Sequence, residues 1–134
     1  MKRMHIGMYV KDLDEAIAFY SQLFGVEPTL RRDDYAKWML DDPRVNFSLD
    51  THFDGEPGTA HYGIQVESMT ELEAMREQLD EASLRRRDQN DLVCGYQLQH
   101  KSWVTGPHGV EWETFFTEGV VEDSDYGDDS LPDQ

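Results

Sequence analysis

Residues 5–23 read HIGMYVKDLDEAIAFYSQL, and residues 61–79 read HYGIQVESMTELEAMREQL, so that one segment occurs twice in the chain. The copies agree at seven aligned positions, which begin with a histidine and a glycine. Each copy starts with the alternation of a strand and continues with the spacing of an amphipathic helix. A strand–helix unit repeated within 134 residues predicts a fold with internal pseudo-twofold symmetry. The two histidines, His5 and His61, are then expected to meet near the symmetry axis.

The first copy predicts a strand followed by a capped helix. Even-numbered residues from Met4 to Val10 are apolar, whereas His5, Gly7 and Tyr9 occupy the opposite face. Asp12 and Glu15 form a capping box before a helix over 13–24, and Gly25 follows as its C-cap. Short strands are expected near 28–33, 35–41 and 45–50.

The second copy repeats this order. A strand over 60–66 precedes Ser68 and Glu71, which form the second capping box, and a helix over 70–82. Strands are expected near 84–88, 97–105 and 110–117. The pattern predicts an α+β fold of two tandem βαβββ modules, about 1–55 and 56–118, forming a half-open eight-stranded barrel around a metal-binding cleft. Residues 119–134 are acidic and lack periodicity, so they are expected to be a disordered tail.

The charge balance restricts the partners. There are 28 acidic and 12 basic residues, a net charge of −16, which argues against nucleic acid and anionic membranes as partners. Only four basic residues are lysines, a composition that suggests a halophilic protein, with an ordinary acidic protein as the alternative. Without an 18-residue apolar run or a signal-peptide pattern, a soluble cytoplasmic protein is expected. The single cysteine, Cys94, excludes an intrachain disulfide.

The repeat also predicts a metal site. His5 and His61 face away from the apolar residues of their strands, and the last strand carries Glu111 and Glu113 on one face. Aligning 45–50 with 110–115 puts Ser48 at the position equivalent to Glu113. His5, His61 and Glu113 would therefore form a two-histidine, one-carboxylate set for a divalent ion. Fe(II) is the preferred ion, and Zn²⁺, Mn²⁺, Ni²⁺ or Co²⁺ also fit.

Other polar residues receive weaker assignments. Glu111 could support a metal ligand, act as a general base, or lie exposed at the rim. Substrate-binding positions along the cleft are expected at Tyr9, Gln65, Lys101, Trp103 and Cys94. His52, His100 and His108 are expected to be solvated, as is the arginine run 85–87.

Several segments resemble the vicinal oxygen chelate superfamily, which includes glyoxalase I, extradiol dioxygenases and bleomycin resistance proteins. The segments are DLDEAIAFYSQLFGVEP (12–28), DDP (41–43), PGTAHYGIQV (57–66) and WVTGPHGVEWETF (103–115). The likeness is closest to the cadmium-induced and arsenic–carbon lyase branch. It implies the glyoxalase/bleomycin resistance/dioxygenase fold, ligands at His5, His61 and Glu113, a small-molecule substrate and a homodimer.

The chain departs from that branch at two positions. The lyases resemble this sequence but carry glutamine where His5 stands, and they hold As(III) with two adjacent cysteines where this chain has Cys94 and Gly95. A single thiolate favours a soft As(III) centre less than a pair does. The resemblance implies a dioxygenase or carbon–heteroatom lyase with a link to heavy-metal or arsenical resistance. The alternatives are a non-catalytic binding protein of the bleomycin-resistance type, capture of a metal or metalloid without turnover, and a glyoxalase-type lyase or isomerase.

Overall fold

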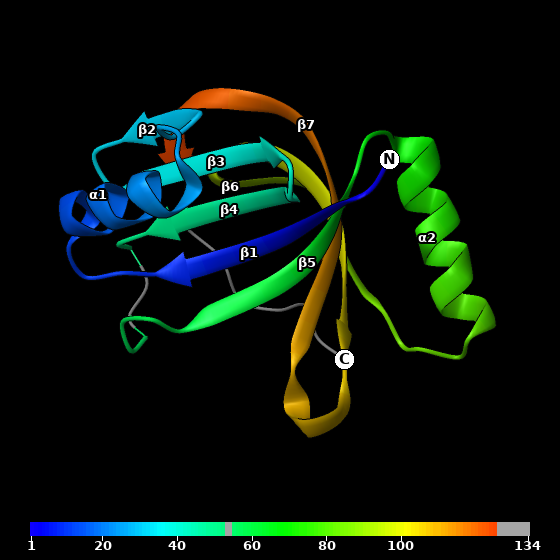
Figure 1. Ribbon diagram of the computed structural model, residues 1–134. Coiled ribbons are helices and arrows are strands. Elements are labelled where there is room, and N and C mark those ends of the chain that lie inside the picture. Colours follow the sequence, from blue (N-terminus) through cyan, green and yellow to red (C-terminus); the bar gives the residue numbers. More distant parts are fainter. Residues whose placement is uncertain (53–54, 126–134) are drawn as a thin grey trace. The chain divides into compact units, whose positions relative to one another are not determined.

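The computed structural model describes residues 1–52 and 55–125, without the side chains of 94–95 and 121–125. The chain divides into two compact units, Arg3–Tyr62 and the segment from Gly63 onward together with Met1 and Lys2. Their boundary falls inside strand β5 (Ala60–Val66), later than the predicted module boundary near residue 55. Figure 1 shows β5 as one continuous strand.

The first unit is a sheet with one helix. Its elements are β1 (Arg3–Tyr9), α1 (Leu13–Phe24), β2 (Leu30–Arg32), β3 (Tyr35–Asp41), β4 (Arg44–Asp50) and the start of β5. The strands follow the order β2-β3-β4-β1-β5. β1 runs parallel to β4, whereas β2, β3 and β4 pair antiparallel.

Helix α1 has the predicted bounds because its caps form as the sequence indicates. The Asp12 carboxylate accepts the Glu15 N–H at 3.0 Å, and Gly25 ends the helix with a φ of 77°. The helix buries its apolar stripe against one face of the sheet (Figure 1), in a cluster made of Leu13, Ile17, Ala36, Trp38, Phe47 and Leu49. Burial of these side chains is the main stabilising term of this unit. Ile6, Met8 and Val10 of β1 pack against this cluster, whereas Met4, on the same apolar face, is 44% exposed.

The second unit contains the rest of β5, α2 (Met69–Glu81), β6 (Arg87–Thr105), a 3₁₀ turn (Pro107–Gly109) and β7 (Glu111–Asp125). The strand order is β5-β7-β6, and β6 and β7 form a long antiparallel hairpin. The strand predicted near 97–105 and the end of the one predicted near 84–88 are thus parts of a single element, in which Asp91 takes a φ of 55°. β7 continues to Asp125, which is seven residues into the expected tail, and 126–134 lie outside the described residues.

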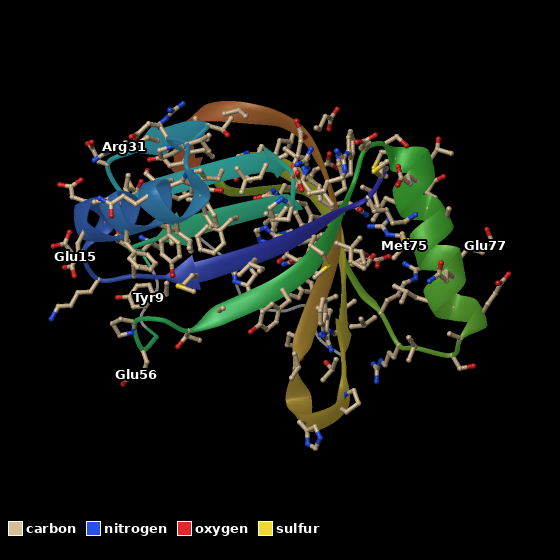
Figure 2. All side chains as sticks on the ribbon, viewed as in Figure 1. Tyr9, Glu15, Arg31, Glu56, Met75 and Glu77 are labelled. Atoms are coloured by element: carbon tan, nitrogen blue, oxygen red, sulfur yellow. The ribbon has the colours of Figure 1, made fainter. Side chains whose placement is uncertain are left out.

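Helix α2 presents different residues on its two sides. Met75 faces the apolar cluster of Val66 and Leu72, whereas Glu77 projects away on the other side of the helix (Figure 2). Arg76 attaches the helix to β6, since it donates to Ser102 Oγ at 2.7 Å and to Asn90 Oδ1 at 2.8 Å. In the described part of the chain, neither helix has the length and apolar character needed to cross a bilayer.

Candidate metal centre

His5 is held in a defined tautomer by the first unit. The side chain is 7% exposed, and its Nδ1 lies 3.1 Å from the carbonyl oxygen of Asn46, its register partner on β4. A carbonyl oxygen only accepts hydrogen bonds, so Nδ1 carries the proton and donates. The lone pair of Nε2 is then available, which is the arrangement found in metal-binding histidines.

The Nε2 atom of His61 lies opposite the Nε2 atom of His5. The two Nε2 atoms lie 3.3 Å apart, with the ring planes tilted by 54°. Two histidine nitrogens bound at 2.0–2.1 Å to one ion, at a tetrahedral angle, are about 3.3 Å apart. The pair therefore has the spacing required for binding one divalent ion, with the tautomer of His5 already set, and His61 is exposed to solvent.

Gly7 explains how His61 fits. It lies two residues after His5 on the same face of β1, and a Cβ at Gly7 would be 2.3 Å from His61 Cε1 and 2.6 Å from Nε2. These separations are below van der Waals contact. Only glycine leaves room for the imidazole, which gives a physical reason for the histidine-x-glycine pattern of the first copy.

Gly63 has the same relation to Glu113 in the second unit. A Cβ at Gly63 would lie 2.7 Å from Glu113 Cγ and 2.6 Å from its carbonyl oxygen. Glu113 is 4% exposed, and Lys101 Nζ is 3.6 Å from its Oε1. The Lys101 ammonium also lies over the rings of Trp103 and Phe115, at 5.5 and 5.8 Å from their centroids. Glu113 is thus a buried carboxylate with a cationic neighbour, as burial of a charge requires.

Glu111 is engaged by other side chains. One of its oxygens accepts from Arg87 Nη2, and the other accepts from Thr105 Oγ1 at 2.6 Å. The expectation that Arg87 is solvated is wrong, since the residue is 5% exposed. Its burial follows from this ion pair, which supplies the counter-charge. Both Glu111 oxygens are already hydrogen-bonded.

The other predicted binding residues lie on several elements. Tyr9 ends β1 (Figure 2), and Gln65 shares a face of β5 with Gly63 by strand alternation. Trp103 donates its indole N–H to Gln89 Oε1 at 2.9 Å. Cys94 belongs to β6, and its side chain lies outside the described part.

His100 is buried, not solvated as expected. Its Nε2 lies 2.9 Å from Glu118 Oε2, and its Nδ1 accepts the backbone N–H of Asp91 at 3.2 Å. Asp91, His100 and Glu118 thus gather three potential metal ligands. However, a ring that accepts at Nδ1 must carry its proton on Nε2, where it donates to Glu118. This tautomer favours a hydrogen-bonded cluster over an ion site.

Lys37 was missed by the sequence analysis. It lies on β3, on the face opposite to the apolar core, and is only 9% exposed. The sequence feature that could have indicated a buried lysine is its position within the otherwise largely apolar run YAKWML (35–40).

Comparison with known proteins places these features in context. A family model described as the Glyoxalase/Bleomycin resistance protein/Dioxygenase superfamily matches residues 2–114. The chain is 41% identical over 126 residues to a trivalent organoarsenical cleaving enzyme of Bacillus sp. (strain MD1), covering 92% of this chain and 78% of that protein. It is 35% identical to a protein of the same name from Thermomonospora curvata, covering 97% and 87%. It is 37% identical to the cadmium-induced protein CadI of Mycobacterium tuberculosis (strain H37Rv), covering 86% and 76%.

Solved structures agree at the level of the fold. A superfamily member from Vibrio splendidus 12B01 superposes with a TM-score of 0.54 at 18% identity, covering 87% of this chain and 99% of that chain. Homoprotocatechuate 2,3-dioxygenase from Arthrobacter globiformis gives a TM-score of 0.60 at 20% identity, covering 90% and 36%.

Proposed function

Because the chain belongs to the Glyoxalase/Bleomycin resistance protein/Dioxygenase superfamily, we propose that it is a metal-dependent enzyme that cleaves a carbon–heteroatom bond of a small molecule. The predicted α+β fold of that superfamily is confirmed by the family match. The proposed ligands are His5, His61 and Glu113. The observation that carries the proposal is the His5–His61 pair, whose facing nitrogens are 3.3 Å apart with one tautomer already set.

Support for Glu113 as the third ligand comes from β5. His61 and Gly63 are two residues apart on this strand, so their side-chain positions share a face. Glu113 rests on Gly63 as His61 rests on Gly7. Gly7 thus makes room for His61, and Gly63 makes room for Glu113. The glycine of each copy of the repeat packs against one proposed ligand.

Three protein ligands leave coordination positions open for a substrate. A bound divalent ion would supply a Lewis acid at this point, and Fe(II) would add the capacity to use O₂. The Asn46 carbonyl keeps His5 oriented, while Lys101 balances the charge of Glu113. Fe(II) is proposed first, with Zn²⁺, Mn²⁺, Ni²⁺ and Co²⁺ as alternatives.

Trivalent organoarsenicals are the substrate class proposed first, because relatives of 41% and 35% identity are named for cleaving them. Cys94 would supply one thiolate for As(III). An extradiol-type dioxygenase is the second candidate, because a two-histidine, one-carboxylate set is characteristic of non-haem Fe(II) oxygenases. A net charge of −16 supports a small-molecule substrate over nucleic acid, and we propose a cytoplasmic homodimer.

The metal site is tested by metal analysis of protein purified without a histidine tag. After incubation with Fe(II), Zn²⁺ or Mn²⁺, the wild type should retain about one ion per chain, as one ligand set requires. His61→Ala and Glu113→Ala should lose it, whereas His52→Ala, at an exposed histidine, should not. A wild type that retains no ion would sink the enzyme proposal and favour a sequestering protein.

The substrate class is tested with the reconstituted enzyme and a methyl- or phenyl-substituted trivalent arsenical. Release of inorganic arsenite that is lost in Glu113→Ala would support the lyase. Cys94→Ala should weaken substrate binding. Unchanged arsenical together with O₂-dependent consumption of a catechol would instead support the dioxygenase.

A further inference from the structure

Lys37 belongs to a row of paired residues that crosses the sheet and ends at Gly7, the glycine against which His61 lies. Strand register puts Lys37 of β3 opposite Ser48 of β4, and Ser48 opposite Gly7 of β1. Residues paired in this way project from the same face of a sheet. His61 lies directly against Gly7. With strands spaced about 4.8 Å apart, the Lys37 backbone is about 10 Å from that of Gly7. An extended lysine side chain and a molecule of a few heavy atoms together span such a gap.

Among the described residues, the strand neighbours of Lys37 on this face carry no negative charge. Its nearest neighbours are Tyr35 and Met39 along β3, with Leu30 and Ser48 across the sheet. Charged and titratable groups on the face of these strands lie farther along them, at Arg3, His5, Tyr9, Arg32, Asp41, Arg44 and Asp50. Asp41 is engaged by Arg3 at 3.2 Å, and Asp50 accepts the backbone N–H of His52.

The ammonium of Lys37 is therefore uncompensated. Within residues 1–52 and 55–125, it has neither an ion-pair partner nor a hydrogen-bond acceptor. Lys101, the other buried lysine, differs because Glu113 lies 3.6 Å from its Nζ. Burial lowers the pKa of Lys37 below its usual value. Because a largely buried cation without a counter-charge is destabilising, Lys37 suggests a counter-charge supplied from outside the chain.

We propose that Lys37 binds an oxyanion of the substrate, a carboxylate or an ionised hydroxyl, while the histidine end of the same face engages the rest of the molecule. The identity of this ligand as the substrate rests on the proposed function. The binding of an oxyanion by Lys37 does not, because it requires no metal. Substrates that carry such a group are then preferred over neutral analogues.

The binding step is tested on metal-free protein labelled with ¹³C at the lysine Cε. The chain has four lysines, so each signal can be followed, and Lys37→Met assigns its own resonance. Benzoate is the probe and neutral benzamide is its matched control. Benzoate should raise the pKa of Lys37 by about 1, as a nearby opposite charge does, and benzamide should leave it unchanged. Equal effects of benzoate and benzamide, or no effect of either, would overturn the proposal.

The role in substrate selection is tested on the metal-loaded enzyme with paired substrates that differ only in one anionic group. Lys37→Met should raise KM for the anionic substrate about ten- to a hundredfold, with KM for the neutral one unchanged. Lys37→Arg should retain part of the preference, and Lys11→Met, at an exposed lysine, should behave as wild type. An equal effect of Lys37→Met on both substrates would refute selection by charge. If the wild-type protein binds no metal, the proposed function is wrong. The benzoate experiment still tests oxyanion binding by Lys37, because it uses metal-free protein.

Discussion

At the scale of single residues, the two buried lysines show how surroundings decide the role of one side chain. Lys101 has Glu113 as a counter-charge, whereas Lys37 has burial without one. A lowered pKa means that folded Lys37 releases its proton at a lower pH than the unfolded chain does, near 10.5. Between these values the unfolded state binds more protons, so the free energy of unfolding rises with pH.

Lys37→Met is therefore expected to increase the free energy of unfolding at neutral pH, on the order of 1 kcal/mol, because it removes an unpaired buried charge. The advantage over wild type should shrink as the pH rises towards 10.5 and disappear above it, where the wild-type lysine is neutral in both states. Urea unfolding at neutral and alkaline pH measures this difference.

Two matched variants separate charge from packing. Lys11→Met should change stability little at any pH, since Lys11 is exposed. Lys101→Met should destabilise, because it leaves Glu113 buried without its cation. A pH-independent gain from Lys37→Met would show that packing, not charge, is responsible.

At the scale of elements, the strand that carries each histidine also carries a glycine two positions later. Gly7→Ala is expected to weaken metal binding about ten- to a hundredfold with little loss of stability. The added methyl would meet the His61 ring, an exposed side chain that can swing away. Gly63→Ala should also destabilise by about 1–3 kcal/mol, because its methyl would meet the backbone oxygen of Glu113.

These glycine variants are compared by metal titration and thermal unfolding. Gly119→Ala is the control, because a Cβ there meets nothing within 4 Å. Wild-type metal affinity in Gly7→Ala would mean that His61 does not need its observed position.

The sequence was sufficient for the helices and for the face of β1 on which His5 lies. Local signals set these features, since Asp12 and Gly25 define α1 and strand alternation defines β1. It was insufficient for β6, a single strand from Arg87 to Thr105 where two separate strands were predicted, because strand pairing extends it through residues without strand alternation. It also failed for Arg87 and His100, because their burial depends on partners at Glu111 and Glu118, which are distant in sequence. Lys37 was missed for the same reason. Only the pairing of β3 with β4 and of β4 with β1 aligns it with Ser48 and Gly7.

At the scale of the whole molecule, a net charge of −16 on 134 residues opposes compaction and self-association. Salt screens this repulsion, with a Debye length that falls from about 10 Å at 0.1 M to about 3 Å at 1 M. Raising NaCl over that range should increase Tm by about 5 °C or more, which corresponds to roughly 1 kcal/mol in a domain of this size. The proposed homodimer should also become more populated, because two chains of like charge repel less.

Thermal unfolding and light scattering across a salt series test both effects. Glycine betaine, a neutral osmolyte, is the control, because it strengthens burial without screening charge. If betaine raises Tm as much as NaCl does, the stabilisation is not electrostatic. A Tm independent of salt would contradict the halophilic interpretation and support an ordinary acidic protein, in which the 28 carboxylates lie too far apart to repel one another measurably.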